Sequence, residues 1–258
     1  MTVSEIRSYW EKQASGGDGK RFGAHSDRHI SDLETWYVIK YALERYMPDT
    51  LLDVGCGKGE RTKLFSKYVK RKTLGLDYSR GMIALAKKSE SALLKFQHAD
   101  ILKAPSLPFV PDMIVSCRCL INLGTYENVL RVMRYFHVML PQDGKLVLCE
   151  CSEQGHVRLN RLRKDVGLKE IQTAWFNINL DEMRLAIDMR GLFEFTELSR
   201  LGIYYLMTRV LYPASIKPRD PDPNSALNAV AEEIQRNLGI GFAEDFGRQY
   251  CVVGTKLK

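Results

Sequence analysis

Residues 51–59 read Leu-Leu-Asp-Val-Gly-Cys-Gly-Lys-Gly, a short apolar run that ends in a turn with three glycines. Glycine lets a backbone approach a ligand closely, and the helix expected over residues 60–70 would offer free N–H groups at its N-terminus. A second apolar run ends on Asp77, whose carboxylate can accept hydrogen bonds from both hydroxyls of a ribose. Together these residues predict a pocket for a nucleoside-bearing cofactor at the carboxyl edge of a parallel sheet.

The spacing of the glycines decides which cofactor we expect. A dinucleotide fingerprint needs a glycine at the position of Glu60, whereas the pattern here is Gly55-x-Gly57-x-Gly59. Asp53, two residues before the first glycine, would repel a pyrophosphate but suits the ammonium and sulfonium groups of S-adenosylmethionine. The pattern therefore favours S-adenosylmethionine over NAD. An ordinary strand-to-helix turn is the alternative, and the acidic residues on both sides of the turn argue against it.

Nearly the whole chain resembles the class I S-adenosylmethionine-dependent methyltransferases. The resemblance starts with the glycine-rich turn and Asp77, and it includes His98-Ala-Asp100-Ile101 after a strand over 93–98. It continues through a strand over 112–117, a helix over 126–140, a Pro-Gln-Asp-Gly turn over 141–144 and a strand over 145–151. The implied fold is α/β, with a doubly wound, mostly parallel seven-stranded sheet of the Rossmann-like methyltransferase type.

The same resemblance implies a set of cofactor-binding residues. Met82 is implied to cover the adenine, and Asp100 resembles the residue that contacts the adenine amino group. The expected set comprises Asp53, Gly55, Cys56, Gly57, Gly59, Asp77, Tyr78, Met82, Asp100, Ile101 and Cys117.

A narrower resemblance, to methyltransferases of glycan- and sugar-tailoring clusters, implies a small-molecule, sugar or glycan acceptor. It rests on Arg118-Cys-Leu-Ile-Asn-Leu123 and on aromatic and basic segments further along the chain. Aromatic faces stack on sugar rings, while amides and arginines bind hydroxyls or phosphate. The same aromatic residues would also suit a hydrophobic core. The expected acceptor pocket contains Arg118, Asn122, Glu153, Trp175, Asn177, Tyr204, Tyr205 and Arg209.

Methyl transfer from a sulfonium is an in-line displacement, so the main task of an enzyme is to align the acceptor and exclude water. A hydroxyl acceptor also needs a base near the transferred methyl group. Glu150 and His156, near the end of the fifth strand, are the expected catalytic residues, and His25 or His29 is a further candidate. The unperturbed pKa of histidine suits this role, although a loop histidine is often simply exposed.

The order of segments predicts the domain organisation. The 258 residues suffice for one α/β domain with a large core. Helices are expected over 2–14 and 29–47, the second with Ser31 as its N-cap. Tyr9 and Trp10 of the first helix would either contact the ligands or pack within the helix layer.

Roughly fifty residues separate the last two expected strands, 193–198 and 248–256, which is too long for a structureless hairpin loop. The predicted division is therefore 1–48 as an N-terminal helical arm or cap, 49–199 as the S-adenosylmethionine-binding core, 200–247 as a substrate lid inserted between the last two strands, and 248–258 as the final core strand.

The net charge of +7 is modest for this length. The basic run 67–72 reads as a solvated helix face and loop. Arg158, Arg161 and Arg163 follow the fifth strand, where they would either bind a phosphorylated or nucleotide-linked acceptor or serve as surface charges on a helix.

Six cysteines include Cys-x-Cys pairs at 117/119 and 149/151. Zinc sites usually use Cys-x2-Cys loops, so these thiols read as packing residues and no metal is expected. No apolar run approaches the roughly 20 residues that span a bilayer, and the N-terminus lacks the apolar core of a signal peptide. We therefore expect a cytoplasmic protein without a membrane partner.

The predicted function is transfer of a methyl group from S-adenosylmethionine to a hydroxyl or amine of a small-molecule, sugar or glycan acceptor. One alternative is methylation of RNA or protein. Against a nucleic-acid base as acceptor, the fourth strand is followed by Ser116-Cys-Arg-Cys119 and not by an Asn/Asp-Pro-Pro-Tyr/Phe motif. The other alternative is a cofactor-binding partner subunit without turnover. The sequence leaves the oligomeric state unspecified.

Overall fold

The computed structural model describes residues 2–15, 27–222, 224–241 and 244–258. Within these residues seven strands form one sheet in the order β3-β2-β1-β4-β5-β7-β6. All neighbouring pairs are parallel except those of β7, which runs antiparallel to both β5 and β6. The strands are β1 (Thr50–Val54), β2 (Lys72–Asp77), β3 (Leu94–His98), β4 (Met113–Cys117), β5 (Lys145–Cys151), β6 (Phe193–Ser199) and β7 (Gln249–Lys256).

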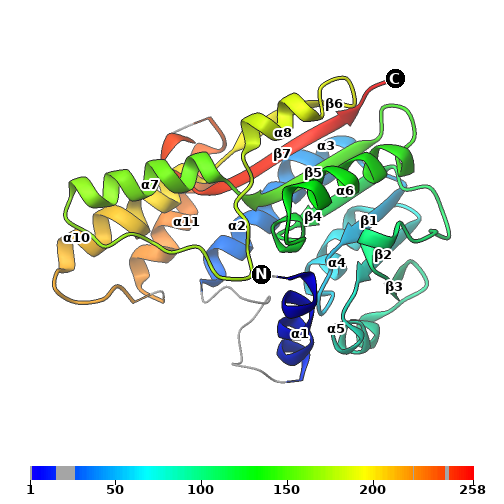
Figure 1. The fold of residues 1–258 in the computed structure, drawn as a ribbon, viewed down its shortest axis with the longest axis horizontal. Helices are drawn as coiled ribbons and strands as arrows, with labels where there is room; N and C mark the ends of the chain where they lie inside the picture. Colours follow the sequence, from blue (N-terminus) through cyan, green and yellow to red (C-terminus); the bar gives the residue numbers. More distant parts are fainter. Residues whose placement is uncertain (1, 16–26, 223, 242–243) are drawn as a thin grey trace.

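Helices cover both faces of this sheet (Figure 1). On one face, α6 (Tyr126–Met139) and α8 (Glu182–Asp188) pack against alternate strand residues such as Leu52 and Ile114. On the other face, α2 (Arg28–Val38) and α4 (Glu60–Phe65) pack against the intervening residues, among them Leu51 and Val115. The strands are apolar on both sides because helices bury both sides, as expected for a doubly wound sheet. The predicted fold class is thus confirmed. The helices are α1 (Val3–Ala14), α2 (Arg28–Val38), α3 (Glu44–Tyr46), α4 (Glu60–Phe65), α5 (Arg80–Ala86), α6 (Tyr126–Met139), α7 (Glu153–Asp165), α8 (Glu182–Asp188), α9 (Gly202–Leu206), α10 (Tyr212–Ile216) and α11 (Ala226–Leu238).

The long helix predicted over 29–47 is present as α2, a π-helical segment over Ile39–Leu43, and α3. The expected N-cap, Ser31, was wrong. Asp27 caps the helix instead, because its carboxylate accepts a hydrogen bond from the backbone N–H of His29 at 3.0 Å. Ser31 therefore lies inside the helix, where it is buried together with Glu34.

The residues between β6 and β7 fold into α9, α10 and α11, beside α2 and α7 (Figure 1). They share a small hydrophobic core with those helices, in which Tyr204 and Ala231 meet Leu33 of α2 and Leu159 of α7. The insertion is therefore packed onto the domain by its own apolar residues. Whether it acts as a lid remains a proposal.

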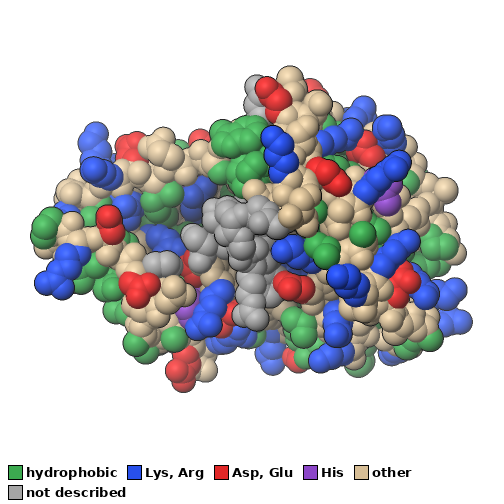
Figure 2. Space-filling view, turned by 90° about the horizontal axis from the view of Figure 1, so that it is seen from below, with side chains coloured by type: hydrophobic (Ala, Val, Ile, Leu, Met, Phe, Trp, Pro, Cys, Tyr) green, Lys and Arg blue, Asp and Glu red, His purple; other side chains and the backbone are tan. Residues whose placement is uncertain are grey.

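Among the described residues, no helix is both long enough and apolar enough to cross a membrane. On the face of the molecule shown in Figure 2, lysine and arginine side chains are interspersed with aspartate and glutamate side chains.

Candidate functional site

A cavity of about 290 Å³ opens at the carboxyl edge of the sheet. Its walls come from the turn between β1 and α4, the ends of β2 and β4, and the loop after β3. Helix α1 and the segment 172–177 contribute further lining residues. The cavity therefore lies where parallel α/β sheets usually bind their ligands.

The glycine-rich turn has the backbone that its sequence requires. Gly55, Gly57 and Gly59 all have positive φ angles, of 77°, 54° and 77°. A Cβ on Gly55 would lie 2.7 Å from Cβ of Cys119, whereas a Cβ on Gly57 would meet nothing within 4 Å. Gly57 thus presents open backbone to the cavity, and Gly55 lets the loop after β4 approach the turn.

Gly59 has a different role from the other two glycines. It is not among the residues that line the cavity, and a Cβ there would lie 2.5 Å from the Phe96 ring. Its left-handed conformation starts α4. Gly59 therefore shapes the helix start and the packing beneath it.

Two carboxylates face the cavity from neighbouring strands. Asp53 in β1 accepts a hydrogen bond from the Thr62 hydroxyl at 2.6 Å, and burial raises its pKa to about 6. Asp77 at the end of β2 accepts hydrogen bonds from the backbone N–H groups of Gly57 at 2.9 Å and Ser79 at 2.8 Å. Burial raises the pKa of Asp77 as well. These anions make this part of the cavity suitable for a cationic ligand with a ribose.

We call the part of the cavity around Asp53 and Asp77 the cofactor half. Its wall also contains Tyr78, Met82, Asp100 and Ile101. Asp100 forms an ion pair with Arg7 of α1. Because Arg7 also lines the cavity, the N-terminal helix closes the site directly over the loop that follows β3.

Helix α1 also closes the cavity through aromatic residues. The Trp10 indole N–H donates to Oδ1 of Asn122 at 3.0 Å, and the Tyr9 ring stacks on Phe176 at 4.5 Å between centroids. Trp10, Asn122 and Phe176 all line the cavity. The arm expected from the sequence therefore covers the site in its helical part.

Arg118 marks the boundary of the second half of the cavity. It has a left-handed backbone, with φ at 57°, and its backbone N–H donates to Cys149 O at 2.8 Å. Its guanidinium lies 3.3 Å from Glu34, which also pairs with Arg61 at 2.5 Å. Burial raises the pKa of Glu34 to about 7, and Arg61 opposes that rise. This buried network anchors the loop after β4 to α2 and α4.

Cys117 at the end of β4 lines the cavity beside Arg118. Beyond it, the wall of the second half contains Asn177, Tyr205 and Arg248. The segment 172–180 crosses the loop after β4 and the end of β5, because Ile178 N donates to Ile121 O at 2.8 Å and Leu180 N donates to Cys151 O at 2.7 Å.

Residues 51–144 match the family described as "Methyltransferase domain". A demethylmenaquinone methyltransferase of Oceanobacillus iheyensis is 32% identical over 111 residues, which cover 41% of this chain. The match spans 45% of that relative, so less than half of its length is shared.

Two solved structures share the fold over nearly the whole chain. The N-methyltransferase NodS of Bradyrhizobium japonicum WM9, in complex with S-adenosyl-L-homocysteine, has a TM-score of 0.60 at 13% identity, with 98% of both chains covered. The magnesium protoporphyrin IX methyltransferase ChlM of Synechocystis PCC 6803, also with the bound product, has a TM-score of 0.57 at 13% identity. That alignment covers 99% of this chain and 100% of the other.

The chain has the fold of the class I S-adenosylmethionine-dependent methyltransferase superfamily, and its residues 51–144 match a methyltransferase domain. The cavity fits the cofactor of that superfamily, because Gly57 leaves room against the backbone and Asp53 supplies a buried anion for the ammonium or sulfonium. Asp77 stands at the strand end where a ribose would be bound.

Glu150, the first catalytic candidate, is not among the cavity-lining residues and is fully buried. One carboxylate oxygen accepts hydrogen bonds from the Ser116 hydroxyl at 2.9 Å and from the backbone N–H groups of Cys119 and Leu120 at 3.1 and 3.0 Å. The other accepts from Ile121 N at 3.3 Å. This geometry argues against proton removal and assigns Glu150 to positioning the loop after β4.

His156, the second catalytic candidate, lies on α7 and does not line the cavity either. Its Nε2 lies 3.2 Å from Asn160 Nδ2, and burial lowers its pKa, so the ring is neutral at physiological pH. Glu153 is exposed and accepts a hydrogen bond from Asn179 at 2.9 Å. Trp175 is 56% exposed and likewise lies outside the cavity lining. These placements argue against direct roles for all three residues.

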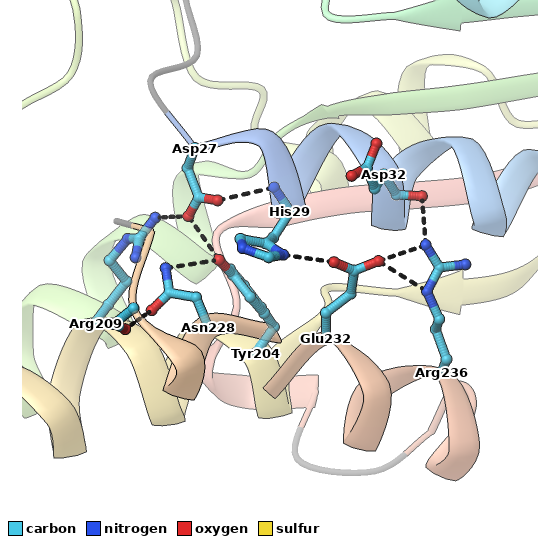
Figure 3. Close-up of polar contacts among 9 residues, drawn as sticks. Asp27, His29, Asp32, Tyr204, Arg209, Asn228, Glu232 and Arg236 are labelled. Atoms are coloured by element: carbon cyan, nitrogen blue, oxygen red, sulfur yellow. Dashed lines mark hydrogen bonds and ion pairs between the residues drawn. The ribbon is translucent and has the colours of Figure 1, made fainter. Parts of the chain in front are cut away.

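Tyr204 and Arg209, expected in the acceptor pocket, instead tie the insertion to α2 (Figure 3). The buried Tyr204 hydroxyl donates to Asp27 at 2.7 Å, and Arg209 pairs with the same carboxylate. His29, a further candidate base, lies 2.6 Å from Glu232 of α11. The structure thus corrects the expectation for these residues, because their polar atoms are used in holding helices together. His25 lies outside the described residues.

The three arginines of α7 lie outside the cavity lining. Arg158 pairs with Asp245 at 2.7 Å, and Arg163 donates to the backbone carbonyls of Lys169 and Arg209. Arg161 is not among the cavity-lining residues. This placement does not support the expectation that these arginines bind an acceptor phosphate.

The cysteines of the neighbouring strands lie side by side. Cys117 is in register with Cys149, and Cys149 with Cys251, across β4, β5 and β7. All six cysteines are free, and the described residues contain no cluster of three or more ligands suited to a metal ion.

Sequence reasoning missed several residues of the cavity wall. Val3, Ile6 and Arg7 share one face of α1 with Trp10, a helical spacing that was readable from the sequence. Arg248 directly precedes the antiparallel β7, whose first residue, Gln249, pairs with Cys151 at the end of β5. That topology places Arg248 at the carboxyl edge, and an expected final antiparallel strand could have indicated it.

Proposed function

We propose that this chain is an active methyltransferase that modifies a nitrogen or oxygen of a small-molecule, sugar or glycan acceptor. The observation that carries the proposal is the single continuous cavity in which the Asp53–Asp77 half adjoins a second half around Arg118 and Tyr205. When bound, S-adenosylmethionine supplies a methyl group already activated by its sulfonium. The residues of the chain therefore need to bind, orient and exclude water.

Several residues are placed for the cofactor. Asp53 provides a buried negative charge, and Asp77 is held by two backbone N–H groups so that it can accept ribose hydroxyls. Tyr78 and Met82 provide the surface for the adenine. Asp100 is proposed to bind the adenine amino group, beside its ion pair with Arg7.

The acceptor half orients its ligand without a side-chain base. Among the described residues that line the cavity, the carboxylates are Asp53, Glu60, Asp77 and Asp100. All four belong to or follow β1, β2 or β3, so they lie in the cofactor half and not in the acceptor half. Burial raises the pKa of Tyr205, so its hydroxyl stays protonated and can donate a hydrogen bond. This arrangement favours a neutral amine, which attacks through its own lone pair, over a hydroxyl that must first lose a proton.

Enclosure favours a small acceptor over a macromolecule. Helix α1 covers the cavity through Trp10, which packs against Phe176 of the segment 172–177, and Tyr205 of the insertion also borders the cavity. We propose residues 200–247 as the lid, with Tyr205 as its contact to the acceptor. The N-methyltransferase NodS shares the fold, which agrees with an amine acceptor but does not identify it. A cytoplasmic location remains part of the proposal.

The test is transfer of radiolabelled methyl from S-adenosylmethionine into fractionated cell extract, with RNase and protease treatments in parallel. Label that survives both treatments and appears in a low-molecular-mass fraction would support the proposal. Label lost to RNase or protease would move the assignment to RNA or protein. Binding of the cofactor without any transfer would instead favour a partner subunit without turnover. Asp77→Ala is the matched control, because it removes the carboxylate that is proposed to bind the ribose of the cofactor.

A further inference from the structure

The carboxylates that line the cavity are confined to one of its two halves. All four lie on the side of β1, β2 and β3, where the cationic cofactor belongs, and the cations Arg7, Lys58 and Arg61 lie on the same side. Beyond the end of β4, the ionised side chains among the described lining residues are Arg118 and Arg248. The acceptor half is therefore lined by cationic groups without a lining carboxylate, which favours an anion there.

The two arginines differ in how far they are neutralised. Arg118 lies 3.3 Å from the buried Glu34, and its other end donates to Ser31 Oγ at 3.2 Å. Arg248 has no carboxylate within ion-pair distance among the described residues, and its buried Nε has no hydrogen-bond partner there. An arginine left without an anion in a half-buried wall is costly unless a ligand supplies one.

The sheet fixes the position of Arg248. Its carbonyl oxygen accepts a hydrogen bond from Ser152 N at 2.8 Å, so the residue is anchored at the end of β5. Its side chain lines the cavity together with Tyr205 and Cys151. The guanidinium therefore stands beside the acceptor half and not on the outer surface.

Two amides line the same cavity as Arg248. The Asn177 amide nitrogen can donate to an anion, whereas its buried Oδ1, which has no partner among the described residues, can only accept from a donor group of the ligand. Gln172 adds a second amide to the same wall. Amide groups and a guanidinium fork are the side chains that bind carboxylate and phosphate oxygens through several hydrogen bonds.

We propose that the acceptor carries an oxyanion, a carboxylate or a phosphate group, and that Arg248 binds it. The inference rests on the proposed methyltransferase function and specifies the substrate class of the same site. The oxyanion fixes one end of the acceptor at the end of β5, which leaves its nucleophilic atom directed toward the Asp53 side of the cavity.

The experiment measures binding of benzoate, phenyl phosphate and neutral benzamide by calorimetry to protein saturated with S-adenosylhomocysteine. Aromatic probes suit the wall formed by Phe176 and Tyr205. We expect the two anions to bind and benzamide to bind at least tenfold more weakly. Phenyl phosphate binding more tightly than benzoate assigns the anion to a phosphate, and the reverse order assigns it to a carboxylate.

Arg248→Gln should weaken anion binding at least tenfold, while Arg158→Gln, which removes an arginine outside the cavity, should leave it unchanged. Arg248→Lys keeps the positive charge but not the forked guanidinium, so it should lose less anion affinity than Arg248→Gln. The lysine variant provides a second test should the glutamine variant not fold. Equal binding of benzamide, no anion binding to the wild type, or an unaffected Arg248→Gln variant would overturn the inference. Failure of S-adenosylhomocysteine to bind would instead count against the proposed function.

Discussion

Trp10 of the N-terminal helix donates its indole N–H to Asn122 in the loop after β4, with 3.0 Å between nitrogen and oxygen. These residues are 112 positions apart in the chain, and both line the cavity. The hydrogen bond therefore joins the cover of the site to the loop that separates its two halves.

Trp10→Phe should weaken S-adenosylmethionine binding about two- to tenfold. An aromatic ring that can pack on Phe176 is kept, although it is smaller than the indole, and the hydrogen bond to Asn122 is lost, which corresponds to about 0.5–1.5 kcal/mol. Calorimetry measures the dissociation constant. Lys12→Ala, on an exposed position of the same helix, is the control. Equal affinity of Trp10→Phe and wild type would show that α1 does not help hold the cofactor.

The affinity for S-adenosylmethionine should fall as the pH drops below about 6. Burial raises the pKa of Asp53 to about 6 in the ligand-free protein, and the positive charge of the cofactor favours the ionised form. Binding at pH 6 should then release protons, and affinity should fall by up to about tenfold per pH unit below 6. Titrations in buffers of different ionisation enthalpy measure this release.

Asp53→Asn is the control for this pH dependence, because it removes the titrating group. The variant should bind more weakly at pH 8 and show a flatter pH profile. The same raised pKa has the opposite effect on folding. Its contribution to stability is fully present below the unfolded pKa of about 3.9 and is lost as the pH rises through about 6. A wild-type affinity that does not change between pH 5 and 8 would contradict the assignment of Asp53.

Glu150→Gln should lower the free energy of unfolding by about 1–3 kcal/mol, because an amide nitrogen would face backbone N–H donors. Turnover should persist at temperatures where the variant is folded. Burial raises the pKa of Glu150 to about 7. The protonated carboxyl therefore contributes to the stability of the fold at low pH, and this contribution is lost as the pH rises through 7. Glu150→Gln has no titrating group at this position, so its free energy of unfolding should not show this pH-dependent loss. A large fall in kcat with an unchanged Tm would restore Glu150 as a catalytic base.

The cofactor half of the site was predictable because its residues follow one another locally. Asp53 and Gly57 are four positions apart, and Asp77 ends the next strand, so a strand-turn-helix-strand pattern places them together. The fold class followed from the same alternation of segments. The final strand was also expected from the sequence, but Arg248 reaches the cavity through the pairing of β7 with β5, a long-range contact that local pattern indicates only when the sheet topology is considered with it.

Glu150 shows a second limit of sequence reasoning. It stands one residue before the end of β5, and successive side chains of a strand point to opposite faces of the sheet. Glu150 therefore points into the layer where the loop after β4 turns its N–H groups inward. Tyr204 and Arg209 were misplaced for a related reason, since their partner Asp27 is more than 170 residues away.

Asp27→Asn should loosen the insertion from α2 while leaving the cofactor half intact. The carboxylate accepts from Tyr204 and Arg209 and also caps α2 (Figure 3), so its neutralisation leaves a largely buried arginine without an anion. We expect a loss of about 1–3 kcal/mol in unfolding free energy and faster amide exchange in α9 and α11. Hydrogen exchange measured by mass spectrometry resolves these helices separately from β1 and β2. Asp220→Asn, at an exposed position of the same insertion, is the matched control and should exchange like the wild type. If both variants exchange at the wild-type rate in α11, apolar packing around Ala231 holds the insertion without the help of Asp27.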